Sequence, residues 1–168
     1  MHVGAREFEA HGDTATAGRL RSMVVDWLHQ HPTTSPSLAR ENLAAYLWFD
    51  RRNGDSAAPH LQRAARDTGS TAVNAVGYLG VIAAQRGDTT RALAVADSLG
   101  RQTRKWDLGL SRWWRASILA TLGRRDEAMQ FLGESRRHGQ GLLDWHAHTA
   151  LRPLRGYAPF EAMIKPEK

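Results

Sequence analysis

The chain has 168 residues with 42% apolar side chains, enough for one domain with a core, and it has no cysteine, which excludes a disulfide framework, a thiolate zinc site and a cysteine nucleophile. Its net charge of +6 comes from residues 101–155, where eleven basic residues stand against five acidic ones. No apolar run approaches the length of a membrane span and the N-terminus lacks a secretory pattern, so we expect a soluble, cytoplasmic protein.

Helical signals dominate, because good helix formers fill long segments and alternating β-branched runs are absent. A short helix from residue 3 is expected to open the chain. The longer predicted helices, in chain order, cover 14–29, 36–53, 56–68, 70–86, 88–99, 107–122 and 126–138. A weaker helix is predicted over 142–150, followed by an irregular tail with a helical turn at 161–164.

Several of these boundaries carry a capping signal. Ser56 is the predicted N-cap of its helix, which places Pro59 in the tolerated first turn. Gly87 is expected to end one helix in the left-handed conformation, and Asp88 to cap the next. The acidic pair 126–127 is expected in the first turn of its helix, where the helix dipole favours negative charge.

The glycine breaks between helices repeat. Gly54, Gly87 and Gly123 are spaced 33 and 36 residues apart, a period that with two helices per unit predicts stacked helical hairpins. Small residues recur at equivalent places around these breaks, and they would let the two helices of a hairpin approach closely. These small residues are Gly80 and Ala116 before the break, and Ala92 and Ala128 after it.

This pattern resembles the tetratricopeptide repeat family, whose motif is W-x₂-L-G-x₂-Y followed by A-x₃-F. The unit at 70–105 matches best, through Val76, Leu79, Gly80, Ala83, Ala92 and Ala96. The stretch 152–166 is similar to the tail that closes such arrays in multidomain bacterial regulators, kinases and cyclases. The chain therefore looks like the C-terminal portion of a repeat array.

The resemblance implies one all-α domain over 1–168, a helical-hairpin solenoid of about three full repeats. A partial repeat at 3–30 comes first, followed by full repeats at 36–69, 70–105 and 106–139 and by a capping helix and tail at 140–168. The truncated start leaves an open repeat end. This end would continue a longer array, form a homodimer, or be covered by Val3 and Phe8.

In this family the first helix of each hairpin lines a concave groove. The residues that the resemblance places there are Glu41, Trp48, Arg51 and Arg52 from one repeat, Asn74, Tyr78, Val81 and Gln85 from the next, and Leu110, Trp113, Trp114 and Ser117 from the last. Aromatic and arginine side chains are typical anchors of peptide-binding surfaces. Two alternatives stand beside an open groove: Trp113 or Trp114 belongs to the core, or the C-terminal tail covers the groove.

Catalytic and metal-binding motifs are weak. The pairs His29-x-His31 and His146-x-His148, the latter near Asp144, invite a metal interpretation, but neither has a third ligand with recognisable spacing. Residues two apart also point to different faces of a helix. We therefore predict no enzyme activity, no metal and no cofactor.

The favoured function is a scaffold that binds a peptide or partner segment in the groove. One alternative is a nucleic-acid-binding repeat that uses the arginine-rich half with Trp106, Trp113 and Trp114 as stacking surfaces. Another is a structural connector whose groove is filled by its own tail. The neutral charge of residues 1–100 favours the protein-binding scaffold over the nucleic-acid binder.

Overall fold

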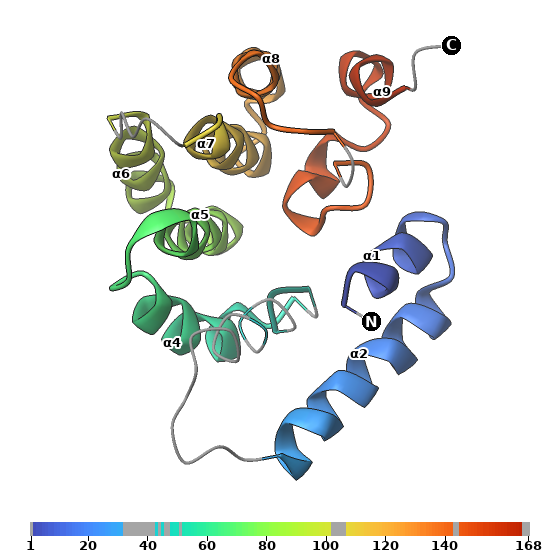
Figure 1. The fold of residues 1–168 in the computed structure, drawn as a ribbon. Helices are drawn as coiled ribbons and strands as arrows, with labels where there is room; N and C mark the ends of the chain where they lie inside the picture. The colour runs from blue at the N-terminus through green and yellow to red at the C-terminus, as the bar shows by residue number, and fades with distance from the viewer. Residues whose placement is uncertain are drawn as a thin grey trace. The chain divides into compact units, whose positions relative to one another are not determined.

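The computed structural model describes residues 2–31, 43, 45, 48–50, 52–101, 107–142 and 145–165. All regular structure in these ranges is helical, and the helices pack in antiparallel pairs (Figure 1), which confirms the all-α class. The chain divides into two compact units, Met1–Ala64 and Ala65–Lys168. Among the described helices, none combines the length and the apolar character needed to cross a membrane.

In the first unit, α1 (His2–Ala10) and α2 (Thr14–Gln30) form an antiparallel hairpin. Both helices match the predicted ones. Ala5, Ala17 and Val24 are buried, so small side chains dominate the contact between the two helices.

The turn between α1 and α2 contains a glycine and an aspartate. Gly12 has a φ of +88°, which suits glycine because it has no side chain. Asp13 is the N-cap of α2, and its carboxylate accepts a hydrogen bond from the backbone N–H of Thr16 at 2.9 Å. This hydrogen bond lowers the pKa of the Asp13 carboxyl.

A buried ion pair joins α1 to the next helical stretch of this unit. Residues 43, 45 and 48–50 are helical, within the helix predicted over 36–53. Arg6 Nε lies 3.0 Å from Asp50 Oδ2, and the two side chains are 7% and 0% exposed. A buried charge pair of this kind is tolerated because each charge compensates the other.

The helix α4 (Gly54–Ala64) begins earlier than predicted. Asn53 takes the capping role expected of Ser56, since its Oδ1 accepts the Ser56 backbone N–H at 3.0 Å. Asparagine is as good an N-cap residue as serine, so capping preference alone does not distinguish Asn53 from Ser56. As a result, Pro59 lies inside the helix rather than in its first turn, and the helix ends at Ala64 rather than near residue 68.

The second unit holds two antiparallel helix pairs, followed by the C-terminal residues 145–165 (Figure 1). The pairs are α5 (Gly69–Gln85) with α6 (Thr89–Gly100), and α7 (Leu110–Thr121) with α8 (Arg125–Arg137). The helix α7 also packs against α5 and α6. No residue of α5 is charged, in keeping with the burial of most of this helix.

The predicted caps of this unit are confirmed. Gly87 has a φ of +77°, and the carboxylate of Asp88 accepts the backbone N–H of Arg91 at 3.0 Å. Gly123 has a φ of +81° between α7 and α8, and both acidic residues of the pair 126–127 lie in the first turn of α8.

Small residues occupy the helix contacts, as the repeat pattern predicts. A Cβ atom added to Gly80 would lie 2.8 Å from Val95 Cγ1 on α6 and 3.0 Å from Ile118 Cγ1 on α7. The other small residues of the pattern are fully buried, namely Ala92, Ala116 and Ala128. A larger side chain at these positions would push the helices apart.

The prediction of a helix over 142–150 is wrong. Residues 145–147 form turns, and a 3₁₀ helix, η1 (Thr149–Leu154), follows them. The His148 side chain accepts the backbone N–H of Ala150 at 3.2 Å, so it caps η1 at a point where an α-helix would have continued. The last helix, α9 (Ala158–Ile164), begins before the predicted turn at 161–164, because Pro159 fits its first turn.

Candidate functional site: an aromatic cluster beneath the C-terminal segment

Four rings in the second unit form what we call the aromatic cluster: Tyr78 of α5, Trp113 and Trp114 of α7, and His148 before η1. The ring centroids of Tyr78 and Trp114 are 4.4 Å apart, and those of Trp113 and Trp114 are 4.7 Å apart with perpendicular planes. His148 lies edge-on to Trp113 at 4.5 Å. These are the separations and tilts that aromatic rings prefer.

The position of Trp114 is fixed from two sides. Its indole N–H donates to Asn74 Oδ1 at 2.8 Å, and the absence of a side chain at Gly77 leaves room for its ring against α5. Asn74 and Gly77 are three residues apart, so they share one face of the helix. The sequence of α5 therefore sets both the place and the orientation of this tryptophan.

Residues 145–154, which we call the C-terminal segment, cover the aromatic cluster. η1 packs against α7, and the Tyr78 hydroxyl lies 3.5 Å from His148 Nε2. The segment is anchored by apolar side chains that are at most 1% exposed: Trp145, Ala147, Ala150, Leu151 and Leu154. A stretch of turns and 3₁₀ helix thus lies across α5 and α7, held mainly by apolar contacts.

Two buried polar atoms are left unsatisfied in this region. Within the described residues, the indole N–H groups of Trp113 and Trp145 have no hydrogen-bond partner. A buried donor without a partner costs about 1–3 kcal/mol. The packing around Trp113 and Trp145 is therefore favourable through apolar burial and unfavourable at these two atoms.

The structure brings the groove residues predicted on α5 and α7 together, but most of them are inside the molecule. The buried ones are Tyr78, Val81, Trp113, Trp114 and Ser117, each at most 3% exposed. Asn74 and Leu110 are half-buried, and Gln85 is exposed. Trp114 is buried against Asn74 and Gly77 of α5, as a core residue between the helices, whereas the C-terminal segment covers Tyr78 and Trp113 through His148.

The groove residues predicted in the first unit are described only in part. Trp48 is half-buried, and Arg52 is exposed with a φ of +59°. Glu41 and Arg51 lie outside the described residues. The structure therefore gives no shared geometry for this part of the predicted groove.

Residues 155–165, which follow the C-terminal segment, contact α8 through Tyr157. The Tyr157 hydroxyl donates to a carboxylate oxygen of Asp126, which raises the pKa of Tyr157. The Arg125 guanidinium lies 5.8 Å from the centre of the same ring. The side chain of Phe160, on α9, is fully buried. The tail is therefore a packed part of the second unit.

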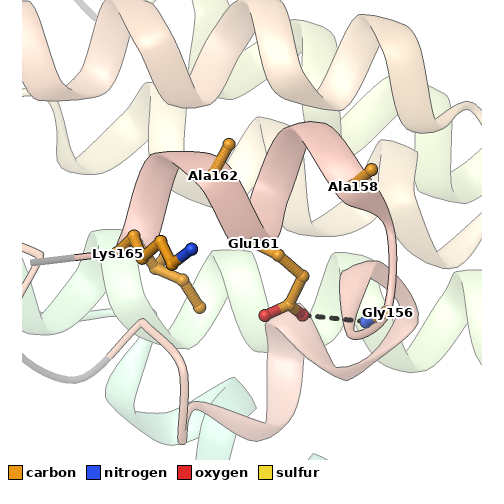
Figure 2. Close-up of a pocket in the computed structure, with 6 residues that line it drawn as sticks. Gly156, Ala158, Glu161, Ala162 and Lys165 are labelled. Carbon is orange, nitrogen blue, oxygen red and sulfur yellow. Dashed lines mark hydrogen bonds between the residues drawn. The ribbon is translucent and has the colours of Figure 1, made fainter.

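A shallow depression lies along α9 (Figure 2). Its lining residues are Gly156, Ala158, Glu161, Ala162, Ile164 and Lys165. The Glu161 carboxylate turns back to accept the backbone N–H of Gly156 at 2.8 Å, as the dashed line shows. The depression is mostly apolar and carries no converging set of reactive groups, so we do not take it as an active site.

Two of the four histidines in these pairs, His31 and His148, make local structural contacts. His31 stacks on Trp27 with ring centroids 4.7 Å apart, and its Nδ1 lies 2.9 Å from the Trp27 carbonyl oxygen. His148 caps η1 through Nδ1. The side chain of His29 lies outside the described residues.

Sequence reasoning missed the residues that complete this site. Trp145, His148 and Leu151 are buried in the C-terminal segment, and although they are spaced three residues apart, the sequence pattern did not mark them as interior. It also left open which apolar residues of α2 are buried. Val24 is buried, whereas Met23 and Trp27 are 55% and 48% exposed.

Comparison with known proteins gives no further guide, because no family model, no curated protein and no solved structure matches this chain. The function is therefore inferred from the geometry of the chain itself.

Proposed function

We propose that this chain is a non-catalytic protein-interaction scaffold, built as a tetratricopeptide-like solenoid, that binds an irregular partner segment across α5 and α7. The antiparallel helix pairs, the Gly87 and Gly123 turns and the small residues in the helix contacts support such an architecture. Stacked helical hairpins serve mainly as binding surfaces for other chains.

The observation that carries the proposal is the C-terminal segment itself. It is a short piece of turns and 3₁₀ helix that packs on the aromatic cluster, so this face already accommodates a chain segment that is not α-helical. Its anchors are a tryptophan and two leucines, Trp145, Leu151 and Leu154. A partner segment with aromatic and aliphatic anchors would bind by replacing it.

A second candidate function is a structural connector with a permanently filled interior. The burial of Tyr78, Trp113 and Trp114 favours it, because these rings are not exposed while the segment is in place. The same burial weakens the nucleic-acid alternative, since it removes Trp113 and Trp114 as stacking surfaces, while Trp106 lies outside the described residues. Arg112 and Arg115 moreover lie 3.4 and 3.5 Å from carboxylate oxygens, which reduces the charge they offer to phosphates.

The test uses a fluorescent peptide with the sequence of residues 145–157 and measures its binding by anisotropy. Two full-length variants are compared with the native chain. Trp145→Ala removes the fully buried anchor of the resident segment, a truncation that costs about 3–5 kcal/mol. Leu108→Ala is the matched control, because Leu108 is 64% exposed in the same unit. Far-UV circular dichroism checks that both variants keep their helices.

If the scaffold proposal is right, Trp145→Ala binds the peptide at least about tenfold more tightly than the native chain, since its own segment competes less. Leu108→Ala should bind the peptide as the native chain does. If the helices are retained and no form binds the peptide at about 1 mM, the connector interpretation is favoured.

A further inference from the structure

One face of α2 is exposed and combines apolar and charged side chains. We call it the α2 stripe, made of Arg19, Met23, Asp26 and Trp27. Their spacing of four, three and one residues places them on one side of a helix. Met23 and Trp27 are 55% and 48% exposed, which is high for side chains of this size. The stripe therefore offers apolar surface that a partner would remove from water.

The charges of the stripe are arranged symmetrically about its centre. Arg19 and Asp26 are opposite in sign and lie on either side of Met23, each about 5 Å along the helix axis from the midpoint between them. A helix with this arrangement is complementary to itself when it is turned around. The apolar centre meets itself, and each end meets the opposite charge.

We propose that the α2 stripe pairs with the α2 stripe of a second copy of this chain, with the two helices antiparallel about a two-fold axis near Met23. The Arg19 of each copy then lies opposite the Asp26 of the other, so one contact type occurs twice, as in any isologous interface. Trp27 lies beside the Arg19 stem of the other copy, where a guanidinium can cover an indole face.

The charges of the stripe are available for this pairing. Arg19 donates to Thr16 Oγ1 at 2.7 Å, an exposed contact that still leaves guanidinium donors for a carboxylate. Asp26 is exposed, and no hydrogen bond or ion pair of its side chain occurs within the described part of the chain. Charge complementarity of this kind selects a second copy over an unrelated apolar partner.

The expected dimer is weak. The helix α2 has 17 residues, so the contact is about 25 Å long and one helix wide. Such a contact is smaller than a standard interface of about 1,600 Å². We therefore expect a dissociation constant in the micromolar range that rises with salt, because exposed charge pairs are screened.

The experiment is sedimentation of the full-length chain over about 1–500 μM at low salt. Two charge reversals are made on the stripe, Arg19→Asp and Asp26→Arg, and both sites are exposed, so folding is preserved. Each variant alone places like charges opposite each other at both symmetric contacts. Mixing the two variants restores opposite charges at both contacts, in a heterodimer. Arg91→Asp, at an exposed position of α6, is the control for net charge.

The native chain and Arg91→Asp should dimerise with similar affinity. Each stripe variant alone should dimerise at least about tenfold more weakly, and an equimolar mixture should recover most of the native affinity. A native chain that stays monomeric over the whole range overturns the proposal. So does a native dimer that both stripe variants retain, or a mixture that does not recover, since either places the interface elsewhere.

Discussion

The substitution Gly77→Ala tests whether α5 and Trp114 pack as closely as the structure shows. In an ordinary helix interior, alanine is more stable than glycine by about 1 kcal/mol. Here the new Cβ would overlap the indole of Trp114, with Cε3 of that ring at 2.6 Å. The Trp114 ring cannot shift freely, because its N–H is hydrogen-bonded to Asn74 and the ring packs against Tyr78 and Trp113.

The expected magnitude follows from these opposing effects. Overpacking a well-filled core costs about 1–3 kcal/mol, and losing the hydrogen bond to Asn74 costs about 1 kcal/mol more. The helix propensity of alanine offsets about 1 kcal/mol of this cost. We therefore expect Gly77→Ala to lower the free energy of unfolding by about 1–3 kcal/mol.

The control is Gly133→Ala in α8 of the same unit. There the nearest atom to an added Cβ, outside the neighbouring backbone, is Arg137 Nη1 at an ordinary 3.6 Å. This substitution should raise the free energy of unfolding by about 0.5–1 kcal/mol. Urea denaturation followed by circular dichroism and tryptophan fluorescence measures both. If the two substitutions stabilise the chain equally, Trp114 does not pack on Gly77.

Three further substitutions are expected to have distinct effects. Ala128→Leu should lower the free energy of unfolding by about 1–3 kcal/mol, because Ala128 is fully buried; an unchanged melting temperature would contradict the helix register. Asp50→Ala should cost about 3–5 kcal/mol by leaving Arg6 buried without this carboxylate, and the double substitution Arg6→Met with Asp50→Leu should cost less; equal losses in urea denaturation would argue against the buried pair. The Asp126 hydrogen bond raises the pKa of Tyr157, so its stabilisation is present at neutral pH and is lost as the pH rises past about 10. The melting-temperature difference between the native chain and Tyr157→Phe should therefore shrink in that range, and a constant difference would refute the assignment.

The helices of this chain were predictable where the signal is local. Gly87 and Asp88 determine a turn by themselves, one through its permitted φ angle and the other through its capping carboxylate. The small residues Gly80 and Ala128 were likewise recognisable, because their spacing from the turns repeats along the sequence. Local signals failed where two were equally strong, as when Asn53 rather than Ser56 capped α4, and over 142–150, where turns and a 3₁₀ helix replace the predicted α-helix.

The sequence left open whether the predicted groove is exposed or covered by the C-terminal tail, because this depends on contacts between residues that are far apart in the chain. The family resemblance placed Tyr78 and Trp113 on one surface, but His148, which comes much later in the chain, lies against both rings. The exposed face of α2 shows the same limit. Met23 and Val24 are adjacent and both apolar, and the local pattern does not indicate which of the two faces the core.

The perpendicular arrangement of Trp113 and Trp114 has a practical consequence. The two indoles are held at 90° with centroids 4.7 Å apart, so each has a fixed and asymmetric environment, and His148 of the covering segment lies edge-on to Trp113. Near-ultraviolet circular dichroism depends on such fixed ring geometry. The chain thus contains its own spectroscopic reporter, whose signal should change whenever the covering segment lifts, with no dye attached.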